Sequence, residues 1–240
     1  VRSRRQRQMC IRDSNNTEHA ANLFGLKEFG NIYSRLGNPT VGALEARLTA
    51  LEDGAMCVAL SSGTSAVMYS LINIMSQGDN FVTANQLYGG TYTMFDNILP
   101  EYGINSKKVD ITDFEAVESA IDEKTRAIYC ETITNPGLVV ADISALADIA
   151  HSKGIPLIVD ATFTTSAILK PFEFGADIVV YSLTKWMSGH GRVIAGAVIE
   201  KGGFDWGNGN FPLYDKPDTS YGGMRSVSYT HLTLPTTPYV

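Results

Sequence analysis

A lysine and an aspartate that each follow an apolar segment are the residues of this sequence best suited to chemistry. Lys185 ends the run Ser182–Lys185, and Asp160, 25 residues earlier, ends the apolar run Leu157–Asp160. A lysine amine forms a Schiff base with an aldehyde, and a carboxylate can hold a pyridine nitrogen protonated so that the ring accepts electrons. Pyridoxal phosphate enzymes need both groups. A surface lysine and an aspartate in a turn are the structural alternative, which these two residues alone leave open.

Small and polar residues elsewhere could bind the phosphate and the ring of the same cofactor. They are Ser62, Gly63, Thr64, Tyr88, Asn135, Ser182 and Thr184. The Ser-Gly-Thr segment lies where an apolar run turns into a helical pattern, so its free amides could bind a phosphate together with the two hydroxyls beside the lysine. The tyrosine could stack on the ring, and the asparagine could contact the ring hydroxyl. Each residue also has a structural explanation, as a helix cap, a strand-end hydrogen bond, a packed tyrosine or an Asn-Pro turn.

Short apolar runs alternate with helical patterns along the middle of the chain. Strands are expected at 56–60, 81–84, 127–131, 157–160, 178–181 and 195–199. Helices are expected at 40–53, from 63 to about 75, at 113–121 and at 142–152. This alternation predicts an α/β fold with a mostly parallel sheet and helices on both faces. Ligands of such sheets bind at the carboxyl ends of the strands. The sequence places four polar residues at such ends: Ser62, Glu131, Asp160 and Ser182.

The first helical pattern has its own cap and its own apolar face. Asn38, Pro39 and Thr40 supply a breaker and a cap before it. One face of the pattern carries Val41, Leu44, Leu48 and Leu51. An amphipathic helix is therefore expected here.

Composition excludes several classes of function. The 240 residues are 44% hydrophobic and 18% charged, which is typical of a packed globular protein, and no apolar stretch is long enough to span a bilayer. Outside the two ends of the chain, 14 basic and 24 acidic residues give a formal charge of −10, which disfavours nucleic-acid binding. Three cysteines without disulfide or metal spacing, and no visible signal peptide, favour a reducing, cytoplasmic location. His151, Asp160 and His190 lack the usual spacing of metal ligands, so no metal site is expected.

Six segments, in this order, resemble the family of pyridoxal phosphate-dependent enzymes of cysteine and methionine metabolism. The resemblance covers about residues 20–225, and six motifs in one order are far more specific than any one of them. The motifs are Tyr33–Thr40, Ser61–Gly63, Leu87–Gly90, Glu131–Pro136, Val159–Asp160 and Ser182–Lys185.

The resemblance implies a role for each candidate residue. Lys185 would be the Schiff-base lysine and the proton-transfer group, Asp160 the partner of the pyridinium nitrogen, and Tyr88 the stacked ring. Gly63, Thr64, Ser182 and Thr184 would bind the phosphate. The family also implies that Tyr33 and Arg35 reach the phosphate of a neighbouring subunit, and therefore a homo-oligomer built from active-site dimers.

The same resemblance implies a domain organisation. We expect the large domain of a fold-type I aminotransferase-like enzyme, with a seven-stranded sheet, at residues 41–225, preceded by part of an N-terminal arm at 15–40. The family's C-terminal small domain, with the arginine that binds the substrate carboxylate, would follow residue 225 and is missing from the sequence. Residues 1–14 and 226–240 resemble translated adapter sequence, and we interpret them as foreign ends.

Within the family the sequence is most similar to the O-acetylhomoserine sulfhydrylases. The similarity lies in Ser188–Gly191, Gly203–Trp206 and Pro217–Tyr221. It implies conversion of O-acetylhomoserine and sulfide, or a thiol, to homocysteine, or methionine, and acetate. Cystathionine γ-synthase and cystathionine or methionine γ-lyase remain alternatives, although methionine γ-lyases typically carry cysteine at the position of Gly90. A non-catalytic fragment is the alternative of another class.

Two further positions, Ala161 and His190, lie close in sequence to the candidate acid and the candidate lysine. Ala161 stands where the family usually has asparagine, which affects the positioning of the ring or of a nearby loop but not the acid itself. His190 follows the lysine by five residues and is expected to be structural rather than catalytic.

Overall fold

A single sheet organises the part of the chain that the structure describes. The computed structural model describes residues 15–24, 27–28, 30, 37–219, 223 and 225–226. The strands are β1 (Met56–Leu60), β2 (Asn80–Ala84), β3 (Asn105–Val109), β4 (Thr125–Glu131), β5 (Leu157–Asp160), β6 (Ile178–Ser182) and β7 (Gly196–Glu200). They form one sheet in the order β1-β7-β6-β5-β4-β2-β3.

Six strands of this sheet run in one direction and β7 runs against them. The pairs β2–β3, β2–β4, β4–β5 and β5–β6 are parallel, whereas β7 is antiparallel to both β1 and β6. The mostly parallel, seven-stranded sheet is therefore confirmed. Because of this direction, the carboxyl ends of β4, β5 and β6 meet at one edge, where the start of β7 also lies.

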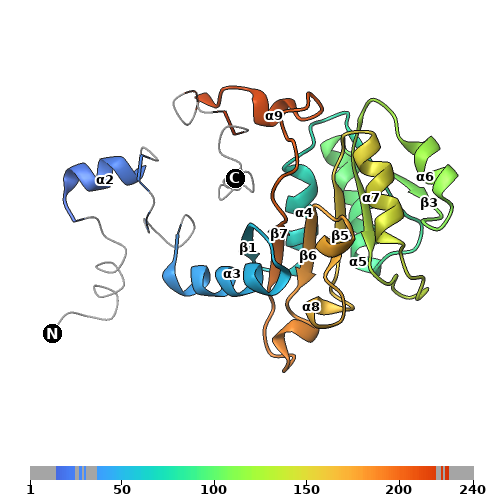
Figure 1. Ribbon diagram of the computed structural model, residues 1–240, viewed down its shortest axis with the longest axis horizontal. Helices are drawn as coiled ribbons and strands as arrows, with labels where there is room; N and C mark the ends of the chain where they lie inside the picture. Colours follow the sequence, from blue (N-terminus) through green and yellow to red (C-terminus); the bar gives the residue numbers. More distant parts are fainter. Residues whose placement is uncertain are drawn as a thin grey trace.

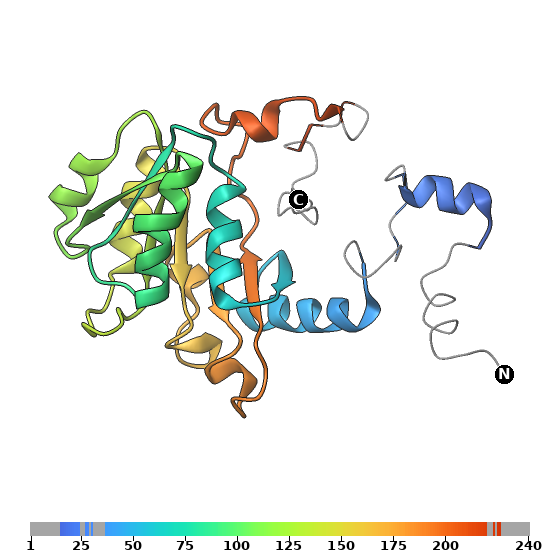
Figure 2. The same cartoon turned by 180° about the vertical axis from the view of Figure 1, so that it is seen from behind.

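Helices cover both faces of the sheet. The α-helices are α2 (Thr17–Phe24), α3 (Pro39–Glu52), α4 (Gly63–Ile72), α5 (Gly89–Thr93), α6 (Phe114–Ala120), α7 (Ile143–Ser152), α8 (Thr165–Ile168) and α9 (Pro212–Asp215). Four short turns are η1 (Met94–Ile98, a π-helix), η2 (Leu99–Tyr102), η3 (Pro171–Phe174) and η4 (Trp186–Ser188). α7 lies in front of the strands in Figure 1, and α4 lies in front of them in the reverse view of Figure 2.

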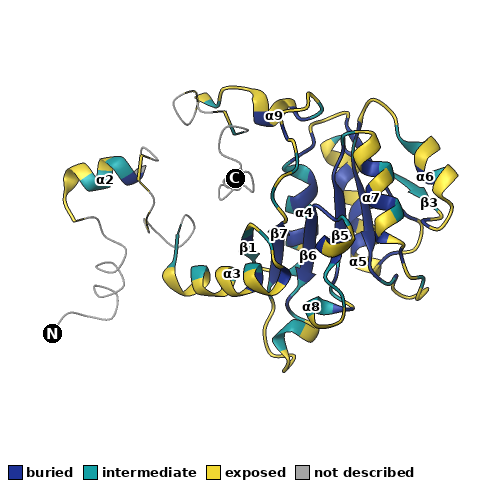
Figure 3. Ribbon diagram, viewed as in Figure 1, coloured by how far each residue is buried: buried dark blue, intermediate teal, exposed yellow. Residues whose placement is uncertain are grey.

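The core lies between the sheet and these helices. Figure 3 shows inner strands such as β5, β6 and β7 largely buried and the outer faces of the helices exposed, whereas the edge strands β1 and β3 are mostly half-buried. On the α5 side, Phe95 contacts Phe81 and Tyr129 edge to face, with ring centroids 4.7 and 5.2 Å apart. Such aromatic contacts, together with the aliphatic side chains of the strands, bury apolar surface and so stabilise the sheet.

Helix α3 forms where the sequence predicts it, but its apolar face lies largely exposed. The Asn38 side chain caps it by accepting from the backbone N–H of Thr40 at 3.0 Å. Leu48 is buried, whereas Val41, Leu44 and Leu51 are exposed. Figure 1 shows why, since α3 extends sideways from β1 beyond the sheet.

The edge strand β3 has no counterpart among the strands that the apolar pattern predicts. It reads Asn-Ser-Lys-Lys-Val and pairs with β2 alone. Charged edge strands of this kind lack the apolar run on which the sequence prediction depends. Among the helices that the structure describes, none is long and apolar enough to cross a membrane. Tyr33, Arg35 and most of both predicted foreign ends lie outside the described residues.

Candidate active site

A cavity of about 690 Å³ opens at the carboxyl edge of the parallel strands. Its lining includes all nine of the described residues that the sequence singles out. They are Ser62, Gly63, Thr64, Tyr88, Asn135, Asp160, Ser182, Thr184 and Lys185. They come from five separate connections of the sheet, so the topology brings together residues that are far apart in sequence. Lys185 and Asp160 lie on the same side of the sheet, as a shared site requires.

Asp160 is an acid that accepts hydrogen bonds but forms no ion pair within the part of the chain that the structure describes. Its carboxylate accepts hydrogen bonds from the Thr162 backbone N–H at 2.9 Å and from the Tyr129 hydroxyl at 3.3 Å. Burial raises the pKa of this carboxyl, and the hydrogen bonds from Thr162 and Tyr129 oppose the increase. No ion pair to Asp160 occurs among the described residues. A cationic group in the cavity would therefore stabilise the charged form.

The start of α4 presents free backbone amides to the cavity. Ser62 caps the helix, and its hydroxyl accepts from the Ser65 N–H at 3.1 Å. The N–H groups of Gly63 and Thr64 have no acceptor within the described part of the chain. Unpaired amides at a helix start attract anions, because the helix dipole adds to their own positive charge.

Gly63 is required by close packing against β6. A Cβ atom added to Gly63 would lie 2.5 Å from the Ser182 Cβ and 2.8 Å from the Ser182 Cα and Oγ. The Ser182 backbone N–H donates to the Thr162 hydroxyl at 2.7 Å, and the Ser182 hydroxyl forms no hydrogen bond with the described side chains and backbone groups. The hydroxyl of Ser182 and the amide of Gly63 therefore lie side by side, as a phosphate-binding pair would.

Thr184 has a structural task in addition to its place in the cavity. Its hydroxyl donates to the Ala195 carbonyl at 3.2 Å and accepts from the Ala195 N–H at 3.1 Å. These bonds join the two ends of the 183–195 connection, which carries Lys185. Ser182 therefore offers the free hydroxyl of the two, a distinction that the sequence does not reveal.

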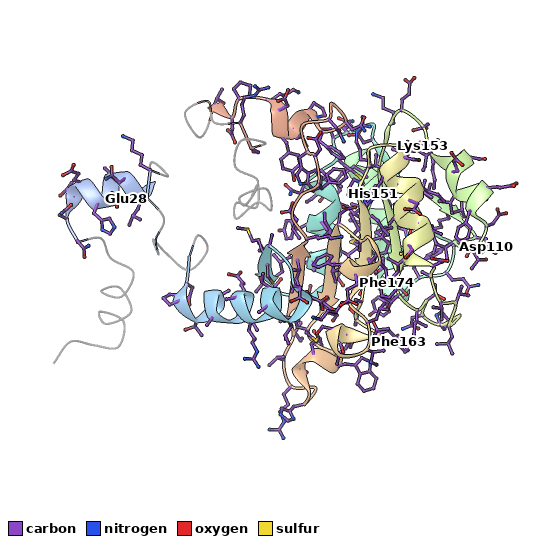
Figure 4. All side chains as sticks on the ribbon, viewed as in Figure 1. Glu28, Asp110, His151, Lys153, Phe163 and Phe174 are labelled. Carbon is purple, nitrogen blue, oxygen red and sulfur yellow. The ribbon has the colours of Figure 1, made fainter. Side chains whose placement is uncertain are left out.

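Lys185 and Tyr88 lie towards the open mouth of the cavity. Lys185 is exposed and forms no ion pair or side-chain hydrogen bond with any described residue. Tyr88 is 48% exposed, and Phe163 and Trp186 line the same mouth. Figure 4 places Phe163 at this edge of the molecule, beside α8. The amine is thus accessible to a ligand that enters from solvent.

Glu131 is a site residue to which the sequence assigns no role. It ends β4 directly opposite Asp160 in the sheet register, is 5% exposed and lines the cavity. Burial raises its pKa to about 7, although two backbone hydrogen bonds oppose the increase. The sequence feature that could have identified Glu131 is an acid at the end of an apolar strand, within the Glu131–Pro136 motif.

The remaining candidates do not line the cavity. His190 is exposed, and Ala161, between Asp160 and Thr162, is fully buried. His151 bonds Asp177 at 2.8 Å near the amino ends of β5 and β6, and Figure 4 shows His151 and Lys153 at the edge opposite Phe163. Within the described ranges no cluster of His, Cys, Asp or Glu could hold a metal ion.

The donor set fits a phosphorylated pyridine aldehyde. The unpaired amides of Gly63 and Thr64 suit its phosphate, and Asp160, which forms no ion pair with any described residue, suits a protonated ring nitrogen. The accessible amine of Lys185 suits its aldehyde.

Comparison with known proteins finds similar sequences and similar structures. The sequence model of the family described as Cys/Met metabolism PLP-dependent enzyme matches residues 7–233. Among curated proteins, the O-acetyl-L-homoserine sulfhydrylase of Leptospira meyeri is 47% identical over 209 residues, which are 87% of this chain and 47% of that protein.

Two solved structures show the same fold. One, from Campylobacter jejuni, is described as an O-acetylhomoserine (thiol)-lyase candidate and contains N'-pyridoxyl-lysine-5'-monophosphate. It superposes with a TM-score of 0.88 at 39% identity, covering 90% of this chain and 54% of that one. The other is cystathionine gamma-lyase from Lactobacillus plantarum in complex with L-serine, with a TM-score of 0.71 at 35% identity and coverage of 88% and 53%. This chain therefore spans about half the length of the relatives it matches.

Proposed function

The chain belongs to the family of Cys/Met metabolism PLP-dependent enzymes, and we propose that it serves a γ-replacement on O-acetyl-L-homoserine. In this reaction a C–S bond to sulfide, or to a thiol, forms at the γ-carbon while the C–O bond to acetate breaks, giving L-homocysteine, or methionine, and acetate. The observation that carries the proposal is the presence of Lys185, Asp160 and the free amides of α4 around one cavity. The choice of substrate rests on the sulfhydrylase relatives.

Pyridoxal phosphate, when bound, supplies an aldehyde that condenses with amines and a ring that accepts electrons. The Asp160 carboxylate would keep the ring nitrogen protonated. Lys185 Nζ would hold the cofactor and then move protons at the substrate carbons. Tyr88 would cover one face of the ring and Asn135 would contact its hydroxyl. Ser62, Gly63, Thr64, Ser182 and Thr184 would surround the phosphate.

We also propose that the enzyme works in the cytoplasm as a homo-oligomer in which Tyr33 and Arg35 complete the neighbouring site. The exposed apolar residues of α3, namely Val41, Leu44 and Leu51, support a second copy covering this helix. The two described cysteines are free and buried, which suits a reducing compartment. Sedimentation analysis that finds only monomers at micromolar concentration would contradict the oligomer.

A second reaction is supported by one observation. The similarity to cystathionine gamma-lyase from Lactobacillus plantarum shows that the same fold also carries elimination chemistry in a relative. Release of 2-oxobutyrate from cystathionine, in place of homocysteine formation from O-acetylhomoserine and sulfide, would favour this alternative.

The test begins with the cofactor and the 240-residue chain. Titration with pyridoxal phosphate is expected to produce the visible absorbance of a lysine-bound cofactor in the natural chain. Lys153→Ala is the control because Lys153 lies at the opposite edge of the sheet (Figure 4), and it should bind like the natural chain. Lys185→Ala should lose the band, and an unchanged band would refute the assignment. A chain that binds the cofactor but forms no product from either substrate pair is the non-catalytic alternative.

A further inference from the structure

Two loops that line the cavity meet at one buried carboxylate. We propose that Glu131 is a positioning residue, whose charged carboxylate ties the segment that begins at Tyr88 to the segment that contains Asn135. This inference rests on the proposed cofactor site, because Tyr88 and Asn135 are the residues proposed to contact the ring. It goes further, because a third residue, Glu131, would fix the positions of these two residues relative to each other.

The geometry of the tie is bidentate. Glu131 Oε1 accepts the Tyr88 backbone N–H at 2.7 Å, and Glu131 Oε2 accepts the Asn135 backbone N–H at 3.0 Å. The two acceptor oxygens thus serve segments that are 43 and 4 residues away in sequence. Glu131 itself lies at the end of β4 and is held by the sheet, so its carboxylate anchors both segments to this strand.

Each segment is ordered locally by bonds of its own. The Tyr88 carbonyl accepts from the Tyr92 N–H at 2.8 Å in the first turn of α5. In the other segment, the Leu138 N–H donates to the Thr134 carbonyl at 2.8 Å. Gln86, two residues before the first segment, also contacts the second, because its side chain fills the space beside Gly137. Among these contacts, the carboxylate is the one that acts directly on the two cavity residues.

The charge of Glu131 decides whether the tie is complete. An ionised carboxylate offers two acceptor oxygens, whereas a protonated one turns one oxygen into a donor and leaves one backbone N–H without a partner. Burial, together with the nearby Asp160, raises the pKa of Glu131 to about 7, and the two N–H hydrogen bonds oppose this increase. Tyr129 and Cys130 on the same strand also have raised pKa values, and no cation bonds Glu131 in the described chain. The tie is therefore complete above neutral pH and weakens as the pH falls.

The first test observes the two amides directly, without cofactor. In amide NMR spectra of the natural chain, the Tyr88 and Asn135 protons are expected to shift together with a midpoint near neutral pH, because both donate to the titrating group. Glu131→Gln has the same shape but one acceptor oxygen, and should remove the inflection from both. Glu101→Gln, at an exposed glutamate of η2, should retain it. The absence of an inflection in the natural chain overturns the tie and needs no variant to be folded.

The second test measures the consequence for the cofactor. At a pH above neutrality, Glu131→Gln should bind pyridoxal phosphate about tenfold more weakly than the natural chain, equivalent to about 1.4 kcal/mol at 25 °C, while Glu101→Gln binds normally. Equal affinity overturns the positioning role. Failure of the natural chain to bind the cofactor at all would instead refute the proposed function, and the amide titration then decides the tie by itself.

Discussion

Substitution of Gly63 by alanine tests whether the start of α4 is packed as closely as the structure shows. The added Cβ would lie 2.5 Å from the Ser182 Cβ and 2.8 Å from the Ser182 Cα, so the helix start or the end of β6 must move. Overpacking of this kind destabilises a protein by about 1–3 kcal/mol. For a chain of this size, each kcal/mol corresponds to about 2–4 °C, so the melting temperature should fall by roughly 2–12 °C.

A matched substitution separates packing from helix propensity. Gly42 lies in α3 with no atom within 4 Å of an added Cβ. Gly42→Ala should therefore stabilise the chain by about 0.5–1 kcal/mol. Thermal unfolding followed by circular dichroism measures both changes. Because Gly63 also offers its amide to the cavity, Gly63→Ala should weaken pyridoxal phosphate binding, whereas Gly42→Ala should not. A Gly63→Ala protein that melts with the natural chain would show that the close contact with Ser182 is wrong.

Three carboxyl groups give further predictions. Glu52 is fully buried, and its Oε1 accepts a hydrogen bond from the Tyr181 hydroxyl. Burial raises the pKa of Glu52. The contribution of Glu52 to the stability of the fold is therefore fully present below its ordinary pKa of 4.5 and is lost as the pH rises through the raised pKa. In urea unfolding, Glu52→Gln should be more stable than the natural chain at pH 8 and no more stable near about pH 4; equal differences at both pH values would contradict this. Asp160→Asn keeps the shape but loses the charge, so pyridoxal phosphate affinity measured by absorbance should fall about tenfold or more, and unchanged affinity would argue against a pyridinium partner. Asp177→Asn weakens the acceptor for His151 Nε2, and urea unfolding should show a loss of about 1–3 kcal/mol.

The strands of the sheet were predictable where they are apolar. Six of the seven follow apolar runs such as Leu157–Asp160, because inner strands that are buried on both faces are nearly continuous apolar segments. The edge strand β1 is also an apolar run, although only Cys57 in it is buried. β3 was not predictable in this way, because it lies at the edge and carries two half-buried lysines, which form ion pairs with Asp122 and Asp96. For α3 the element was predicted correctly, but the burial of its apolar face was not. Periodicity correctly predicts a helix, but it cannot say whether Val41 and Leu44 pack within this chain.

The site was predictable to the extent that strand ends determine it. Asp160 and Ser182 end parallel strands, so topology alone brings them to one edge. Glu131 ends the neighbouring strand, yet its role depends on which backbone amides come within reach of its oxygens. Those amides belong to irregular segments, whose paths no periodic pattern encodes.

The antiparallel strand β7 explains how the lysine connection is held. Gly196, its first residue, pairs with both Leu60 and Ser182, and a Cβ there would lie 2.0 Å from the Ser62 carbonyl oxygen. The backbone before α4 therefore lies directly on the start of β7. A strand parallel to β6 would begin at the opposite edge of the sheet. Because β7 is antiparallel to β6, the connection between them leaves the sheet and re-enters it at the same edge. Lys185 is thus carried by a segment whose second end is fixed beside the start of α4, and the lysine and the free amides of α4 line the same cavity.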